Sequence, residues 1–201
     1  MKRLLLLLIA TMYHFSAHAD YEPTLLADLI DSADLIMYGE ITTAQGKFVT
    51  AEPLQILKGS PSVGSITIEK FENWTCASRF AAYKTGQREI FFLKKHKSSK
   101  SLSPLGAANE GEMPVVNDKV YYKQQYLALD KSPKQFKVYG GIVNGYTYNK
   151  FTFLAAITSY LHNRIVLLTE VAKNQESIDT TSNPVLLRIL NEYHGLHFRT
   201  Y

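Results

Sequence analysis

Residues 35–41 read LIMYGEI, a run of β-branched, aromatic and long apolar side chains that predicts a β-strand. A glycine inside such a run is typical of a bulge or a sharp bend, and we expect one at Gly39. Working outward, a second apolar run follows the turn residues at 45–46 and ends at the turn signal KGSP, residues 58–61. Two long strands joined by a tight turn therefore open the domain.

More strands follow in the middle of the chain. Residues 65–71 alternate apolar and polar side chains, and residues 89–93 read EIFFL, an apolar strand core. Tight hairpin turns need residues that tolerate positive φ, as Asn, Asp and Gly do. We therefore expect one hairpin over 115–120, turning at Asn117-Asp118, and another over 136–148, turning at Asn144-Gly145.

Helical spacing is confined to the two ends of the chain. Apolar residues recur every three or four positions over 23–33, 151–172 and 184–193, and Gly195 is a typical residue after the end of the last helix. Strands clustered between helices indicate an α+β fold, and several short strands with tight turns indicate a small closed antiparallel barrel. We expect the barrel over 20–148 and a helical region over 149–201.

Three segments carry a family resemblance. Residues 33–41 (ADLIMYGEI), 54–59 (LQILKG) and 86–93 (GQREIFFL) resemble strand motifs of secreted bacterial relatives of the netrin-like modules and the tissue inhibitors of metalloproteinases. The resemblance covers about residues 25–145 and leaves the C-terminal helices unmatched. It implies a five-stranded OB-like barrel, and OB folds bind proteins, oligonucleotides or sugars.

One departure from that family bears on function. The metalloproteinase inhibitors use a disulfide-tethered N-terminal cysteine that caps the zinc of the protease. Here the expected mature chain begins Asp20-Tyr21, so no residue inherits that chemistry. Protease inhibition is therefore an alternative that rests on the resemblance alone.

The first 19 residues have the features of a cleavable signal peptide. Lys2 and Arg3 precede an apolar run over 4–10, and the small residues Ala17 and Ala19 fit a cleavage site before Asp20. We expect an exported protein, periplasmic or secreted, with no transmembrane segment after cleavage.

The net charge and the cysteine content limit the classes of partner that we expect. The net charge of the whole chain is +4, and the leader contributes two of the basic residues, so we expect no nucleic-acid partner. The single cysteine, Cys76, excludes an internal disulfide and leaves a disulfide-linked dimer open.

Candidate catalytic and metal-binding residues are few. A thiol enzyme would use Cys76 with a nearby base, but the nearest histidine in the mature chain, His96, lies in a Lys-rich loop. His194 and His197 are three residues apart, with Gly195 between them, and a polar tail explains them better than a metal site. We expect no metal, no cofactor and no enzymatic activity.

Tyrosines crowd the second half of the chain. On a hairpin alternate side chains point outward, and exposed tyrosines are typical of protein-binding surfaces, although tyrosine also simply suits strands. The candidate binding residues are Tyr139, Tyr146 and Tyr148 on the 136–148 hairpin. The sequence thus favours an exported, non-enzymatic module that binds another envelope or extracellular protein, with a protease inhibitor or a Cys76-dependent enzyme as alternatives.

Overall fold

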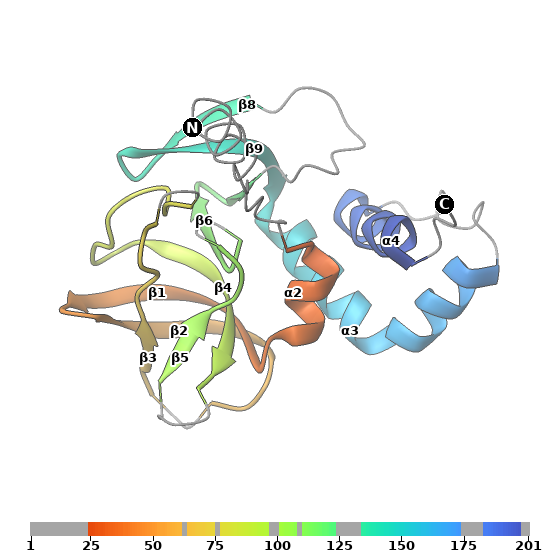
Figure 1. The fold of residues 1–201 in the computed structure, drawn as a ribbon, viewed down its shortest axis with the longest axis horizontal. Helices are drawn as coiled ribbons and strands as arrows, with labels where there is room; N and C mark the ends of the chain where they lie inside the picture. Colours follow the sequence, from red (N-terminus) through yellow and green to blue (C-terminus); the bar gives the residue numbers. More distant parts are fainter. Residues whose placement is uncertain are drawn as a thin grey trace, which may run out of the picture.

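The computed structural model describes residues 24–61, 64–74, 77–96, 101–107, 110–123, 134–173 and 183–197. The expected signal peptide, residues 1–19, and Cys76 lie outside the described residues. The described part is an α+β fold in which a β-barrel and its sheet extension pack against helices on one side (Figure 1).

A closed barrel of five strands forms the first half of the fold. Its strands are β1 (Leu35–Gln45), β2 (Phe48–Lys58), β3 (Ile66–Glu69), β4 (Arg88–Lys95) and β5 (Leu102–Pro104). They run in the order β1-β2-β3-β5-β4, and pairing of β1 with β4 closes the ring. This confirms the OB-like barrel, with one refinement: β3 and β5 are parallel, and the other barrel pairs are antiparallel.

Strand β1 is central because both of its faces are buried. Leu35 and Met37 point into the barrel core, whereas Ile36 and Tyr38 face the helices. The register between β1 and β2 shifts beside Gly39, as the sequence predicts. A Cβ at this glycine would lie 2.9 Å from the carbonyl oxygen of Glu52, so only glycine allows the two backbones to approach this closely.

A second region of the sheet extends beyond the barrel and is joined to it by the pairing of β6 with β4. It consists of β6 (Glu112–Val116), β7 (Lys119–Lys123), β8 (Lys134–Val138) and β9 (Gly141–Asn149). Strand β6 pairs with both β4 and β7, and the order continues through β9 to β8. The first hairpin turns at Asn117 and Asp118, with φ of 50° and 55°, as predicted.

The predicted turn of the last hairpin is wrong. The chain turns at Tyr139-Gly140, with φ of 52° and 84°, and Asn144-Gly145 lies inside β9. The Tyr139 hydroxyl explains this choice, because it accepts a hydrogen bond from the N–H of Arg88 and donates one to the carbonyl of Val115, at 2.9 Å each. These contacts fix a positive-φ conformation that local sequence rules disfavour for tyrosine.

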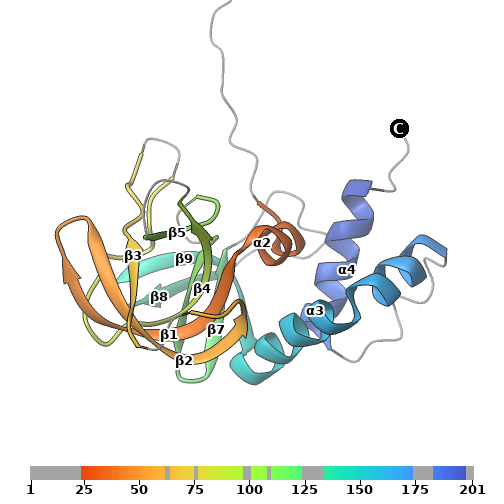
Figure 2. The ribbon, with the colours of Figure 1, turned by 90° about the horizontal axis from the view of Figure 1, so that it is seen from below.

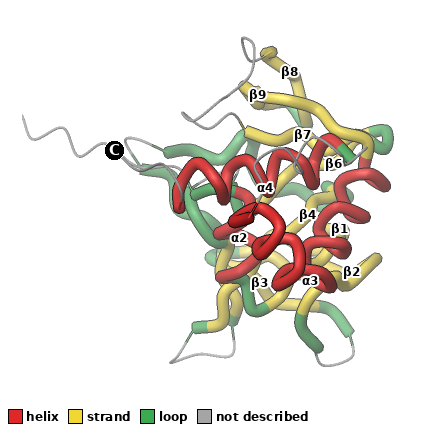
Figure 3. The backbone as a smooth tube through the Cα atoms, turned by 90° about the vertical axis from the view of Figure 1, so that its right-hand side faces the viewer, coloured by secondary structure: helices red, strands yellow, loops and turns green. Residues whose placement is uncertain are grey.

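Three helices cover the outer face of the barrel: α2 (Leu26–Ser32), α3 (Lys150–Lys173) and α4 (Pro184–His197). Asn149 and Asn183 cap α3 and α4, because each Oδ1 accepts N–H bonds at the start of its helix. The predicted end of the last helix is corrected, because α4 continues past Gly195 to His197. Figures 2 and 3 show the three helices together on one side of the barrel, with α4 packed across α3.

The helices and the barrel share one apolar core. Buried side chains of α2, α3 and α4 pack against the outward residues of β1 and β4 and against β6 and β7. Within the described residues, Lys150–Thr169 of α3 is long and apolar enough to cross a membrane by length and composition. Phe153, Ile157 and Tyr160 of this segment are fully buried in the shared core, but only 28% of its apolar window is buried in the fold.

Candidate functional site

Tyr146 and Tyr148, two of the predicted binding residues, contact α4. The guanidinium carbon of Arg188 lies 4.8 Å from the ring centroid of Tyr146 and 4.8 Å from that of Tyr122. Its Nη1 donates a hydrogen bond of 3.0 Å to the hydroxyl of Tyr148. Stacked, hydrogen-bonded arginine is a strong link between elements. Strand β9 therefore uses these tyrosines to hold the last helix.

Tyr139 lies apart from the other two, at the turn between β8 and β9. Its hydroxyl bonds join that turn to β4 and β6. All three tyrosines are half-buried, and the structure does not bring them together on one outward surface. Alternation along β9 places Tyr146 and Tyr148 on one face of the strand, but nothing in the sequence indicates that α4 covers this face. Their part in partner binding stays a prediction.

Glu192 completes the attachment of α4. Its Oε1 accepts a 2.8 Å bond from Nε of Arg188, and its Oε2 accepts a 2.9 Å bond from the backbone N–H of Leu26. Burial raises the pKa of Glu192, while Arg188 and the N–H of Leu26 oppose that shift. One carboxylate thus ties the first turn of α2 to the last helix.

A buried cluster of charges closes one end of the barrel. Residues 70–87 link β3 to β4 across this end, which we call the Arg79 end. The guanidinium of Arg79 forms a buried ion pair with Glu89. Its Nε lies 3.4 Å from Oε2 of Glu112. Tyr83 donates a 2.8 Å hydrogen bond to Glu112, and its ring stacks 3.8 Å from the guanidinium carbon.

The cluster holds two carboxylates against one guanidinium, in a place that water does not reach. Burial raises the pKa of Glu112 to about 8 and also raises the pKa of Glu89, against the opposing attraction of Arg79. Paired carboxylates with shifted pKa values are typical of acid–base sites. Here Arg79 contacts both carboxylates, and all three side chains are at most 2% exposed, so the cluster fastens Arg79 to strands β4 and β6.

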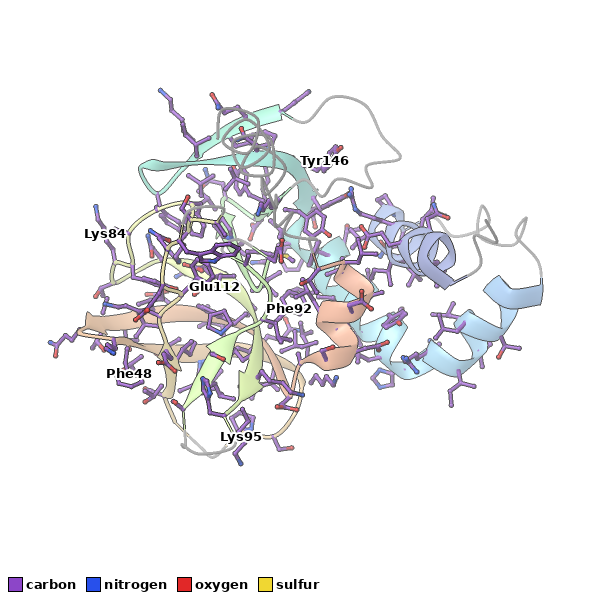
Figure 4. The ribbon with its side chains drawn as sticks, viewed as in Figure 1. Phe48, Lys84, Phe92, Lys95, Glu112 and Tyr146 are labelled. Carbon is purple, nitrogen blue, oxygen red and sulfur yellow. The ribbon has the colours of Figure 1, made fainter. Side chains whose placement is uncertain are left out.

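The two glutamates of this cluster can be found in the sequence, but their cationic partner cannot. Glu89 begins the apolar run EIFFL, and Glu112 also lies within a strand. A carboxylate on a buried strand needs a cationic partner, but the sequence does not identify it: Arg88, next to Glu89, pairs with Glu40 instead, and Arg79 pairs with Glu89. Figure 4 shows Glu112 among the side chains inside the fold.

The other chemical candidates are not assembled into a site. Nε2 of His96 lies 3.1 Å from Oε2 of Glu69, and the described part of the chain contains no group of three or more His, Cys, Asp or Glu side chains that could hold a metal. His194 and His197 belong to α4, and their side chains are not among those described. Cys76 is outside the described residues.

An uncharged stripe of exposed side chains runs along α3. Its members recur every three or four positions and contain no Lys, Arg, Asp or Glu. They are Phe151, Ala155, Thr158, His162, Ile165, Val166 and Thr169. Phe151, Ile165 and Val166 are 64%, 79% and 63% exposed. Strand β2, which contacts α3, also carries two exposed apolar residues, Leu54 and Ile56. We call these seven residues of α3 the α3 stripe.

The α3 stripe is the surface of the described residues best suited to another macromolecule. Exposed large apolar side chains that gather on one surface are typical of interaction sites, whereas single ones are ordinary. The sequence periodicity predicts this helix, but it does not show which of its apolar side chains are buried and which stay uncovered.

Compared with protein-family models, with curated proteins and with the solved structures, the chain has no match. The resemblance to netrin-like modules and metalloproteinase inhibitors is therefore a prediction from sequence motifs. The fold class and the barrel rest on the structure itself.

Proposed function

We propose that this chain is an exported, non-enzymatic protein-binding module of the cell envelope, and that the α3 stripe is its binding surface. The observation that carries the proposal is the row of uncharged, exposed side chains from Phe151 to Thr169, on a helix whose other face contributes to the core. The features of residues 1–19 support export to the periplasm or beyond.

The chemistry of the stripe defines the partner. A charged side chain placed against it would lose water without gaining an ion partner, which is costly. An apolar, uncharged helix of the partner could lie along the stripe and bury Ile165 and Val166. The partner is therefore a protein that presents such a helix.

The test is affinity capture from native envelope extract with three baits. The first bait is the unchanged chain, the second carries Ile165→Asp, and the third carries Phe48→Asp as a matched control. Phe48 is also an exposed apolar residue, and it lies on β2 at the far side of the barrel from α3 (Figure 4). A partner that is retained by the Phe48→Asp bait and lost with Ile165→Asp supports the proposal. A protein captured equally by all three baits contradicts it.

Protease inhibition is the second candidate, favoured by the three sequence motifs and by the five-stranded barrel that they imply. A panel of metalloproteases assayed with the purified chain tests it, and stoichiometric inhibition would replace the first proposal. A Cys76-dependent enzyme is the third candidate, and any activity that survives Cys76→Ser would end it.

A further inference from the structure

The barrel end opposite the Arg79 end contains a cleft of about 440 Å³. It lies where β1 begins, β4 ends and the chain leaves β2 for β3, and we call this the Lys95 end. The lining residues are Asp34, Leu35, Ser60, Pro61, Ser65, Ile66, Thr67, Lys95 and Leu102. A volume of this size is within the range of sites for small organic ligands.

The inner wall of the cleft is apolar. Leu35 and Ile66 belong to the core inside the barrel, and Leu102 of β5 packs against that core. These side chains are anchored by strand pairing, so the wall is formed without a ligand. Because Leu35 and Ile66 are only 4% and 6% exposed, a short apolar ligand body would mainly cover the half-buried side chain of Leu102.

The rim of the cleft is polar, and its hydrogen-bonding groups are available. Ser60, Ser65, Thr67 and Lys95 are exposed, and no side-chain hydrogen bond or ion pair to another described residue engages them. Asp34 differs, because Oδ1 accepts a 3.0 Å bond from Nζ of Lys94 and Oδ2 a 2.9 Å bond from the N–H of Lys95. The carboxylate on the rim is therefore satisfied, and the hydroxyls and the Lys95 ammonium are not.

The charges around the cleft favour an anion. Lys58 is held by the carbonyl oxygens of Ile30 and Asp31 at the end of α2, and Lys94 is held by Asp34 and the carbonyl of Ser32. Both ammonium groups therefore bring positive charge close to the cleft, although each donates its hydrogen bonds to acceptors of the protein itself. Lys95 then adds a cation that forms no ion pair with any of the described residues.

We propose that the cleft at the Lys95 end binds a small organic carboxylate, with the anion paired to Lys95 and its apolar body against Leu35, Ile66 and Leu102. A single ammonium with hydroxyl groups suits a carboxylate, whereas phosphate sites more often use an arginine fork or a row of backbone N–H groups. The carboxylate has two sources, a free aliphatic acid or the C-terminus of a peptide ending in an apolar residue.

The experiment titrates the purified chain with three probes and follows them by ligand-observed NMR. The probes are hexanoate, a pentapeptide that ends in leucine with a free C-terminus, and the same peptide with an amidated C-terminus. The variants are Lys95→Gln, Ser65→Trp, which fills the cleft from an exposed position, and Lys84→Gln. Lys84 is an exposed lysine at the other end of the barrel (Figure 4) and is the matched control. Circular dichroism checks that each variant folds.

The proposal predicts saturable binding of a carboxylate probe, weakened about fivefold or more by Lys95→Gln, abolished by Ser65→Trp and unchanged by Lys84→Gln. Binding of hexanoate alone assigns the free acid, and binding of the free peptide but not the amidated one assigns a peptide C-terminus. The proposal is overturned if no carboxylate probe saturates, or if folded Lys95→Gln and Lys84→Gln bind alike.

Discussion

The backbone N–H of Leu26, at the start of the first helix, donates a 2.9 Å hydrogen bond to Oε2 of Glu192, near the end of the last helix. The two ends of the described chain are thereby joined through one buried carboxylate. The same carboxylate holds Arg188, which lies between the rings of Tyr122 and Tyr146. The C-terminal helix is thus part of the fold and not an appendage to it.

Removal of the Glu192 carboxylate should loosen both terminal helices. We expect Glu192→Ala to lower the free energy of unfolding by about 3 kcal/mol, because Arg188 and the N–H of Leu26 lose their partner in a buried place. Urea denaturation measures the change, with Glu52→Ala on the exposed part of β2 as the control. A loss below about 0.5 kcal/mol, the range of ordinary surface substitutions, would contradict this role.

Arg188 should not be replaceable by lysine. Arg188→Lys keeps the charge but loses the planar stacking between two tyrosine rings and the bond to Tyr148, so we expect a loss of about 1–2 kcal/mol. Denaturant unfolding followed by tyrosine fluorescence tests it. Equal stability of the lysine variant and the unchanged protein would show that only the charge of Arg188 matters.

The same contacts change the expected effect of the tyrosines. Tyr146→Ser and Tyr148→Ser together should lower the unfolding free energy by about 2–4 kcal/mol, since they remove rings packed against the core and the supports of Arg188. Thermal melting checks this, with partner capture measured only on the folded fraction. An unchanged melting temperature together with lost capture would restore these tyrosines as a binding surface.

The Arg79 end should make stability depend on pH. The pKa of Glu112 is about 8 in the fold and near 4.5 when unfolded, so between these values the fold holds a proton that the unfolded chain has released. The unfolding free energy therefore falls as pH rises through this window, by up to about 1.4 kcal/mol per pH unit. The contribution is fully present below pH 4.5 and is lost as pH passes 8.

Unfolding measured from pH 5 to pH 9 tests this dependence. Glu112→Gln should flatten the slope because it replaces the protonated carboxyl by a neutral group of the same shape. Glu40→Gln, which removes a carboxylate paired with Arg88 on the exposed side of β1, should leave the slope unchanged. A slope that is equal in all three proteins would exclude Glu112 as its source.

Removal of Arg79 tests the same cluster from the cationic side. Arg79→Met leaves the Glu89 carboxylate buried without its cation and Glu112 without its partner, and we expect a loss of about 3–5 kcal/mol at pH 7. Adding Glu89→Gln and Glu112→Gln to that variant should restore part of the stability, because no charge is then left buried. A triple variant less stable than Arg79→Met would contradict the electrostatic explanation.

The sequence predicted the barrel, the bulge at Gly39 and the first hairpin because local signals there agree with tertiary packing. At 139–145 they conflict: Asn144-Gly145 is the better isolated turn, but the hydroxyl bonds of Tyr139 place the turn at Tyr139-Gly140. Gly195 similarly fails to end α4. The Arg79 cluster and the Arg188 stack join residues distant in sequence, and no local pattern reports such pairings.

We propose above that the α3 stripe binds a partner protein, and photo-crosslinking in the intact cell is the most direct test of this binding. A photoreactive amino acid is introduced at Ile165 in one variant and at Phe48 in another. We expect the photoreactive residue at position 165 to crosslink one protein, and the residue at position 48 not to crosslink that protein. Adducts only with lipid at position 165, or the same adduct from both positions, would contradict it.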